Sequence, residues 1–155
     1  MIEHVTDDIF DGGDDVIVHG CNCMCTMGSG IAKQVRALYP HAWEADKATR
    51  QGDFCKLGTY SKAKMKNVRI PGRNITIVNA YTQKVPNPEF KPFDYDAFET
   101  VCRLIKRDFA GQSIAFPRIG AGFAGGDWDR IERIVTEVFD DVKVKVYTRP
   151  GEFGT

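Results

Sequence analysis

The chain has 155 residues, about one domain's worth, and a fold of this size buries roughly 70% of its unfolded surface without a disulfide or metal staple. Its 21 Lys and Arg residues balance 21 Asp and Glu residues, which excludes the uniformly basic surface of a non-specific nucleic-acid binder. The apolar runs, such as 75–80, are far shorter than the roughly 20 residues of a membrane helix, and residues 1–4 lack the basic start of a signal peptide. We therefore expect a single domain over residues 1–155 that is soluble, cytoplasmic, monomeric and not associated with membranes.

The cysteine pattern also indicates a reducing environment. Five is an odd count; Cys21, Cys23 and Cys25 are crowded together, whereas Cys55 and Cys102 stand far apart. A secreted disulfide framework does not normally look like this. Structural zinc prefers C-x2-C spacing with a second ligand pair, and the three histidines are not grouped to supply one. We expect reduced thiols in a tight loop, with no metal and no cofactor.

The first third of the chain predicts one strand followed by two helices. Residues 16–18 form a β-branched run bounded by glycines, which suits a buried strand. Apolar residues then recur at helical spacing over 31–38, until Pro40 forbids continuation. A second helix is expected from Pro40 to about Gln51, where Gly52 ends it.

The middle third reads as strands. We expect strands over Leu57–Lys62, Asn67–Ile70 and Ile75–Ala80, with residues 71–74 as the turn of a hairpin between the last two. Residues 81–92 contain three prolines and predict a loop.

The last third predicts two helices and two strands. Apolar residues at helical spacing follow Asp94 as far as Phe109 and recur over 128–139. Short strands are expected over 113–116 and over 142–147, where Val alternates with Lys. The chain therefore predicts an α/β fold, with a mixed sheet of six or seven strands covered on both sides by about four helices.

Two glycine-containing loops, over 20–30 and 120–126, each lead from a short apolar strand into a helix. In open α/β sheets, ligands bind beyond the carboxyl ends of the strands. The P-loop pattern and the G-x-G-x-x-G of dinucleotide folds are both absent from these loops. Together the two loops predict a cleft that holds a diphosphate between two sets of backbone N–H groups.

The two loops belong to a longer series of motifs along the chain. The segments of this series are Asp8-Ile9, Val16 to Cys23, Met27 to Ala32, Tyr39-Pro40, and Pro117 to Gly122 with Trp128. In their order and spacing, and over almost the whole chain, these segments resemble the ADP-ribose-binding macro domains. The Pro-Arg-Ile-Gly and His-Gly-Cys-Asn-Cys forms are similar to the branch of that family that contains ADP-ribose-1''-phosphate phosphatases and terminal ADP-ribose glycohydrolases.

The resemblance implies a three-layer α/β/α fold with a cleft for ADP-ribose or ADP-ribose 1''-phosphate, and ADP-ribosylated macromolecules as further partners. Asp8 would accept a hydrogen bond from the adenine amino group, with the N–H of Ile9 on a ring nitrogen. The alternative for Asp8 is a solvated acidic residue. Asn22 would bind hydroxyls of the distal ribose.

The resemblance also assigns residues to the phosphates and the aromatic contacts. Tyr147 would stack on adenine or, alternatively, be a strand tyrosine half in the core; Phe123 would cover the distal ribose or tuck inward. Trp128 fits the core stripe of its helix. The residues implied for the two phosphate loops are Gly28, Ser29, Gly30 and Ile31 in the first, and Gly120, Ala121, Gly122, Phe123, Ala124 and Gly125 in the second.

Two residues are candidates for chemistry. His19 matches a histidine of the phosphatase-like members and could protonate a leaving oxygen or orient water; alternatively, it ties a strand end by hydrogen bonds. Asp127 could serve as general base or could cap the helix that follows it.

The resemblance also implies a test between reactions. Glycohydrolase relatives use a lysine at the end of the strand that matches Ile75–Ala80, and an aspartate in the second loop. Here the strand end reads through Gln83, with Lys84 only several residues later, and Ala124 stands where the aspartate would fall. We therefore expect hydrolysis of ADP-ribose 1''-phosphate, with ADP-ribosyl hydrolysis or simple ADP-ribose binding as alternatives.

Overall fold

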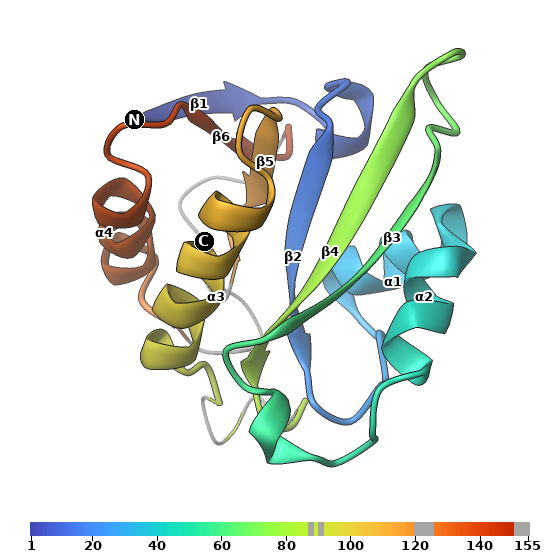
Figure 1. Cartoon of the computed structure of the whole chain (residues 1–155), viewed down its shortest axis with the longest axis vertical. Coiled ribbons are helices and arrows are strands. Elements are labelled where there is room, and N and C mark those ends of the chain that lie inside the picture. Colours follow the sequence, from blue (N-terminus) through green and yellow to red (C-terminus); the bar gives the residue numbers. More distant parts are fainter. Residues whose placement is uncertain (87–88, 90–91, 120–125, 151–155) are drawn as a thin grey trace.

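The computed structural model describes residues 1–86, 89, 92–119 and 126–150, which form a sheet with helices on both faces (Figure 1). The strands are β1 (Ile2–Thr6), β2 (Val16–Asn22), β3 (Tyr60–Lys66), β4 (Asn74–Gln83), β5 (Ile114–Pro117) and β6 (Val144–Thr148). The α-helices are α1 (Gly30–Leu38), α2 (Pro40–Lys47), α3 (Tyr95–Asp108) and α4 (Trp128–Val138), and η1 (Ile9–Asp11) and η2 (Phe54–Lys56) are short 3-10 helices. No helix in this described part of the chain is long and apolar enough to cross a membrane.

The strand order is β1-β6-β5-β2-β4-β3, and all neighbours up to β4 run parallel. β3 pairs antiparallel with β4 and forms one edge, so the sheet is mixed. Because five strands run the same way, their carboxyl ends lie at one border of the sheet, called here the carboxyl edge. The ends of β2 and β4 lie together at the bottom of Figure 1. The predicted three-layer fold with a mixed sheet is confirmed.

Each face of the sheet has its own apolar core. α3 and α4 pack on one face, where Val18, Phe98 and Ile131 are fully buried. α1, α2 and η1 cover the other face, where Ile17 and Val35 are buried. Adjacent residues of β2 thus point to opposite cores, as expected for a strand that is buried on both sides.

The sequence prediction of two separate strands over 57–62 and 67–70 is wrong. β3 is one strand that pairs with β4, and the residues after it form the turn of the hairpin. Asn67 explains the turn, because its side-chain oxygen accepts hydrogen bonds from the N–H groups of Arg69 at 2.9 Å and Ile70 at 3.0 Å. Asn side chains that bond to nearby backbone in this way favour turns over strands.

Other boundaries also differ from the prediction. β2 continues to Asn22, and β4 runs into the predicted loop as far as Gln83, because the two strands keep pairing at the carboxyl edge. α2 ends at Lys47 instead of near Gln51. β1 is missing from the prediction, since its segment contains Glu and His and carries little apolar signal. α3, α4, β5 and β6 confirm the remaining predictions to within two residues.

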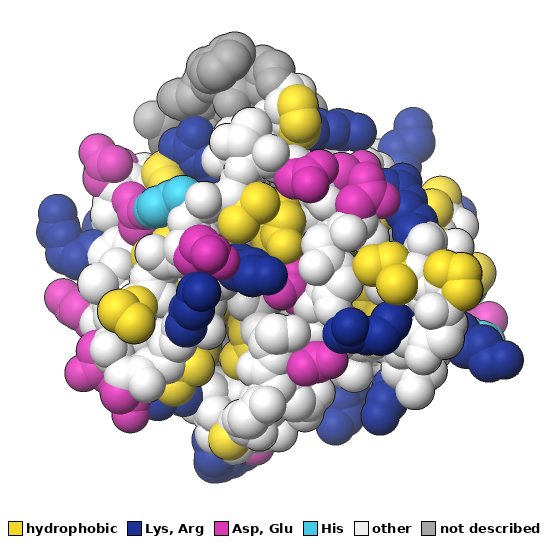
Figure 2. Space-filling model, turned by 90° about the horizontal axis from the view of Figure 1, so that it is seen from above, with side chains coloured by type: hydrophobic (Ala, Val, Ile, Leu, Met, Phe, Trp, Pro, Cys, Tyr) yellow, Lys and Arg dark blue, Asp and Glu magenta, His cyan; other side chains and the backbone are white. Residues whose placement is uncertain are grey.

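Charges of both signs are mixed on one end of the molecule. Figure 2 shows the end of the molecule that lies at the top of Figure 1, where acidic and basic side chains are interspersed. This mixing agrees with the balanced charge count of the chain. The face in this view therefore offers no broad basic field of the kind that attracts polyanions without specificity.

Candidate functional site

The ends of β2 and β4 carry the first glycine-containing loop, residues 20–30. Asn22 at the end of β2 is paired with Gln83 at the end of β4. The Asn22 side-chain oxygen accepts a hydrogen bond from the N–H of Met24 at 2.8 Å, and its amide donates to Thr26 Oγ1 at 2.7 Å. Asn22 therefore lies at the carboxyl edge, where its side chain shapes the loop, and its predicted contact with the distal ribose stays a prediction.

The same loop ends at the N-terminus of α1. Ser29 occupies the cap position, but its side chain makes no capping hydrogen bond to the described residues. Gly28, Ser29 and Gly30 are exposed, and Ile31 is half-buried. Gly30 has φ +57°, which glycine adopts without strain. Since the first N–H groups of a helix lack intrahelical partners and carry partial positive charge, this end of α1 is suited to an anion.

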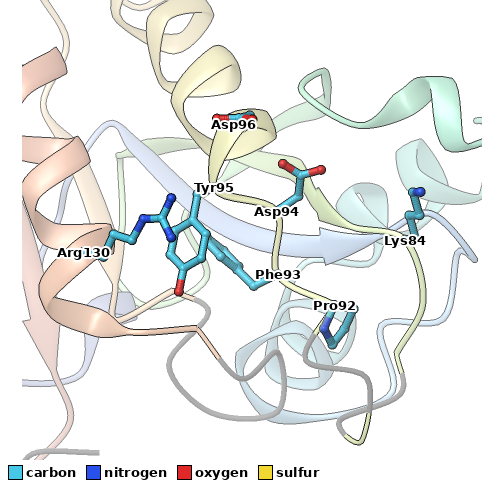
Figure 3. Close-up of a pocket in the computed structure, with 7 residues that line it drawn as sticks. All are labelled: Lys84, Pro92, Phe93, Asp94, Tyr95, Asp96 and Arg130. Carbon is cyan, nitrogen blue, oxygen red and sulfur yellow. The ribbon is translucent and has the colours of Figure 1, made fainter.

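Lys84 directly follows β4 and lies beside the first loop. Its backbone oxygen accepts a hydrogen bond from the N–H of Cys23 at 3.1 Å, which ties the end of β4 to the loop. Lys84 also lines an open pocket of about 390 Å³ with residues 92–96 and Arg130 (Figure 3). Across the pocket from Lys84, the Arg130 guanidinium lies 3.8 Å from the centroid of the Tyr95 ring. The pocket thus combines two cations, the carboxylates of Asp94 and Asp96, and an aromatic wall.

One helix cap lines this pocket, and a second is bonded to Tyr95 in its wall. Asp94 caps α3, with Oδ1 accepting a hydrogen bond from the N–H of Ala97 at 2.9 Å. Asp127 caps α4 through the N–H of Asp129 at 3.0 Å, and its own N–H donates to the Tyr95 hydroxyl at 2.8 Å. Asp127 therefore caps α4, which was one of its two predicted roles. A carboxylate has about four lone-pair positions, so a second role as general base stays a prediction.

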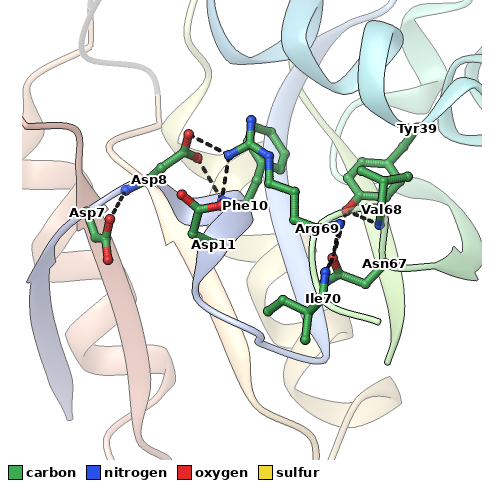
Figure 4. A network of polar contacts seen from close by, with 9 residues as sticks. All are labelled: Asp7, Asp8, Phe10, Asp11, Tyr39, Asn67, Val68, Arg69 and Ile70. Atoms are coloured by element: carbon green, nitrogen blue, oxygen red, sulfur yellow. Dashed lines mark hydrogen bonds and ion pairs between the residues drawn. The ribbon is translucent and has the colours of Figure 1, made fainter. Parts of the chain in front are cut away.

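Asp8 lies just beyond the carboxyl end of β1, and two contacts hold its carboxylate (Figure 4). One oxygen accepts a hydrogen bond from the N–H of Phe10 at 2.9 Å, and the other pairs with Arg69 at 2.8 Å. Arg69 comes from the β3–β4 turn and also pairs with Asp11 at 3.0 Å. Partial burial acts to raise the pKa of Asp8, but the hydrogen bonds from Arg69 and Phe10 hold this pKa below its usual value. Asp8 is thus an oriented carboxylate beside the buried Ile9, and the predicted adenine contacts of both residues stay predictions.

His19 is fully buried in β2 and bonded to the neighbouring strand. Its Nε2 lies 2.6 Å from Asn79 Oδ1 in β4, and Asn79 Nδ2 donates to the backbone oxygen of Ala42 in α2 at 3.0 Å. Burial lowers the pKa of His19 to about 4, although the hydrogen bond to Asn79 acts to raise it. The ring is neutral at pH 7 and out of reach of solvent. These contacts favour the interpretation of His19 as a residue that ties strands together.

A buried polar network continues from Asn79 toward the first loop. Asn79 Nδ2 also donates to Ser61 Oγ at 3.0 Å, and Ser61 Oγ lies 2.8 Å from the Tyr81 hydroxyl. The Tyr81 hydroxyl donates to Asp46 Oδ1 at 2.7 Å. Burial raises the pKa of Asp46, which is 1% exposed, while Tyr81 and Lys56 act to lower it. The network joins α2, β3 and β4 beneath the loop.

The cysteines are free thiols, and three of them belong to the first loop. Cys21 and Cys23 are buried beside Met27 and Tyr81. Burial raises the pKa of both thiols. Protonated, buried thiols pack like small apolar side chains, so these two stabilise the loop. Within the described ranges, no three His, Cys, Asp or Glu side chains are grouped to hold a metal ion.

Tyr147 lies in the core, with 5% of the residue exposed. Its hydroxyl donates to Asp14 Oδ2 at 2.7 Å, and burial together with Asp14 raises the pKa of Tyr147. Gly12 leaves room for this hydroxyl, because a Cβ at Gly12 would lie 2.1 Å from it. These contacts favour the core interpretation of Tyr147 over stacking on a ligand.

The predicted second phosphate loop lies outside the described residues, so its contacts stay predictions. Just before it, the Arg118 guanidinium lies 5.1 Å from the centroid of the Trp128 ring. Trp128 packs against the core between the sheet, α3 and α4, as its position in the apolar stripe of its helix predicts. The residues outside the description are Gly120, Ala121, Gly122, Phe123, Ala124 and Gly125.

The structure adds Lys84, Tyr95 and Arg130 to the site. The apolar run 75–80 predicts a strand that ends several residues before Lys84, but β4 continues to Gln83, so Lys84 directly follows the strand. Tyr95 and Arg130 lie in the first turns of α3 and α4, far apart along the chain. Helical spacing predicts the two helices, but it gives no sign that their first turns meet.

Residues 18–135 match the family model described as Macro domain. This match covers more than half of the chain. The chain therefore belongs to the macro domain family, which confirms the resemblance drawn from its motifs.

Named relatives extend this result. An uncharacterized 17.5 kDa protein of Enterobacteria phage T4 is 42% identical over 125 residues, which are 77% of this chain and 76% of that protein. The DNA ADP-ribosyl glycohydrolase of Mycobacterium tuberculosis is 29% identical over 158 residues, covering 97% of this chain and 43% of that protein. This chain therefore spans less than half the length of the mycobacterial relative.

Solved structures show the same fold. The macrodomain of Mycobacterium tuberculosis DarG is 25% identical, with a TM-score of 0.72 over 95% of this chain and 97% of that chain. Thermosipho africanus DarTG in complex with ADP-ribose is 18% identical, with a TM-score of 0.80 over 99% of this chain and 43% of that chain. At this lower identity, the second likeness concerns the fold alone.

Proposed function

We propose that this chain binds ADP-ribose at the carboxyl edge and hydrolyses the bond between ADP-ribose and a DNA base. Membership of the macro domain family and the uncapped N-terminus of α1, which suits a phosphate, support the binding. The similarity to a DNA ADP-ribosyl glycohydrolase over 97% of this chain supports the reaction.

The binding part of the proposal uses the oriented groups at the carboxyl edge. Asp8 accepts a hydrogen bond from the adenine amino group. Its carboxylate has about four lone-pair positions, and the bonds from Arg69 and from the N–H of Phe10 occupy only two of them. The exposed backbone of Gly28 and Ser29 lies against the diphosphate. Asn22 contacts the distal ribose from the end of β2.

The observation that carries the reaction is the position of Lys84. This lysine follows β4 directly, is bonded through its backbone to the first loop and lines the pocket of Figure 3. A lysine amine at this point can attack the anomeric carbon C1'' of ADP-ribose. The bond from Nζ to C1'' forms as the bond from C1'' to the base nitrogen breaks, and the amine proton passes to the departing base.

Water completes the reaction. It bonds to C1'', the bond from C1'' to Nζ breaks, and a water proton returns to the lysine nitrogen. We assign the positioning of this water to the second carboxylate oxygen of Asp127, since Oδ1 caps α4 and the backbone N–H of Asp127 donates to the hydroxyl of Tyr95, a residue of the pocket wall. The flat surface of Arg130 on Tyr95 suits stacking of the departing base.

Release of phosphate from ADP-ribose 1''-phosphate is the second candidate. The cations Lys84 and Arg130 and the uncapped start of α1 favour a substrate with a further phosphate. The buried and neutral His19 argues against the proton donor that this reaction was expected to use.

The test runs both substrates in parallel on the wild type, Lys84→Ala and the control Lys143→Ala, which removes another exposed lysine. We expect ADP-ribose to be released from an ADP-ribosylated oligonucleotide, and Lys84→Ala to slow release by about 10³-fold or more, the scale of losing a nucleophile. ADP-ribose affinity should stay within a few fold, and Lys143→Ala should behave as wild type. Release of phosphate alone would select the second candidate, and binding without either product would make the protein an ADP-ribose reader.

A further inference from the structure

The edge strand β3 carries a row of three lysines, Lys62, Lys64 and Lys66, which alternate with Ala63 and Met65. Ala63 and Met65 pack against the core that α1, α2 and η1 cover, so the lysines point to the opposite face of the sheet. All three lysines are exposed. Side chains two residues apart along a strand are roughly 7 Å apart, so the row is roughly 13 Å long.

Among the described carboxylates, Asp108 interacts electrostatically with Lys62, whereas Lys64 and Lys66 form no ion pair. Lys62 Nζ lies 5.4 Å from the centroid of the Phe109 ring. The carboxylate closest to this contact in the chain, Asp108, pairs with Arg107 at 2.8 Å and accepts a hydrogen bond from the Tyr60 hydroxyl at 2.6 Å. Among the described residues, no carboxylate forms an ion pair with a lysine of the row.

The row also runs along the strand that leads away from the candidate site. Lys62 is paired with Val78, six residues before Lys84, so the row begins roughly 20 Å from Lys84. β3 is antiparallel to β4, and Lys64 and Lys66 lie progressively farther from the carboxyl edge. Stacked nucleotides rise about 3.4 Å each, so about six nucleotides span the gap from Lys84 and about four more span the row.

We propose that the lysine row binds the phosphate backbone of the DNA strand whose modified base occupies the site at the carboxyl edge. That the bound strand is modified DNA rests on the proposed function. That the row contacts phosphates rests on the exposure of its lysines and on the absence of ion pairs to described carboxylates. It assigns sequence-independent affinity to β3, because lysine contacts to phosphates position a strand without reading its bases. A chain with balanced charge then holds DNA by one local strip.

Lysines on an edge strand have another known use, which is to prevent edge-to-edge pairing between molecules. The two roles predict different results. A guard role changes aggregation only, whereas a binding role changes the salt dependence of DNA affinity.

The experiment measures binding of an unmodified, fluorescent single-stranded 20-mer at several salt concentrations. The variant Lys64→Gln/Lys66→Gln is compared with wild type and with Arg133→Gln/Lys143→Gln, which removes two exposed positive charges from the α4 and β6 side. Each lost phosphate contact lowers the slope of log K against log salt by about 0.7, so we expect a decrease of about 1.4 in the first variant alone. Lys64→Arg/Lys66→Arg should keep the wild-type slope. An unchanged slope in the Gln variant, or no binding by wild type at low salt, overturns the proposal.

A second measurement separates this proposal from the proposed function. If the protein is active, the Gln variant should lose activity on modified strands with ten or more flanking nucleotides, but not on a modified nucleoside. If DNA binding depends on the lysine row but no ADP-ribose is released, the proposed hydrolysis is refuted and the proposed DNA contact of the row is supported. If ADP-ribose is released but the salt slope is unchanged in the Gln variant, only the proposed DNA contact of the row is refuted.

Discussion

Tyr81→Phe should destabilise the fold, because it leaves the buried Asp46 carboxylate without its donor. The Tyr81 hydroxyl lies 2.7 Å from Asp46 Oδ1, and Asp46 is 1% exposed. Stranding a buried, charged acceptor costs about 2 kcal/mol. In a domain of this size, each kcal/mol lowers the Tm by roughly 2–4 °C, so we expect a decrease of about 4–8 °C at pH 7.

The size of this loss should depend on pH. Burial raises the pKa of Asp46 and the Tyr81 hydroxyl acts to lower it, so the pKa rises further in the variant. The folded variant then keeps a proton that the unfolded chain has lost, and its stability falls as pH rises from about 4 through the raised pKa. The difference between wild type and variant should therefore be largest near neutral pH and shrink toward pH 4.

Tyr60→Phe is the matched control. Its hydroxyl lies 2.6 Å from Asp108 Oδ2, but this carboxylate is exposed and also pairs with Arg107. Thermal and urea unfolding should show a much smaller loss for this variant than for Tyr81→Phe. Equal losses in the two variants, or a Tyr81→Phe loss that stays constant on acidification, would refute the reasoning.

Three further changes test other parts of the structure. The folded pKa of His19, about 4, lies below its unfolded value of 6.5. The folded state therefore resists protonation, and His19 should lower the free energy of unfolding by about 2 kcal/mol between pH 7 and pH 5. In urea unfolding, the His19→Asn variant should lack this decrease. The same pH dependence of the unfolding free energy in wild type and variant would contradict the prediction. Gly12→Ala should lower the free energy of unfolding by about 1–3 kcal/mol, because the new Cβ displaces the Tyr147 hydroxyl. An unchanged Tm would contradict this prediction and show that the core accommodates the Cβ. Asp8→Ala should weaken ADP-ribose binding by about 1–3 kcal/mol in calorimetry, and Arg69→Ala should weaken it less; normal binding by Asp8→Ala would return Asp8 to the solvated interpretation.

The parts of the fold that follow from local pattern could be predicted from the sequence. α3 and α4 each bury one stripe of apolar side chains and begin at an aspartate cap, Asp94 or Asp127, so spacing and caps agree. The glycine-containing loop after β2 was likewise visible as glycines between a β-branched run and a helical pattern.

The parts that depend on pairing between distant segments could not be predicted. The ends of β2 and β4 keep pairing past the apolar run, and only this pairing brings Lys84 to the first loop. The burial of His19 depends on Asn79 and α2, which lie far away in the sequence. The ion pair of Asp8 with Arg69 depends on how the hairpin turn meets η1. The order of the motifs indicates which residues lie near the cleft, but it does not predict their hydrogen-bond and ion-pair partners.

The central claim is that the carboxyl edge holds ADP-ribose as a whole, with both riboses and the diphosphate. The most direct measurement compares the melting temperature with ADP-ribose, AMP and ribose 5-phosphate at equal concentrations. At a hundred times its dissociation constant, a ligand adds about 2.7 kcal/mol, which raises the Tm by roughly 5–10 °C in a domain of this size. We expect ADP-ribose to produce this rise and the two fragments to produce much less, whereas equal shifts for all three, or none for ADP-ribose, would contradict the account.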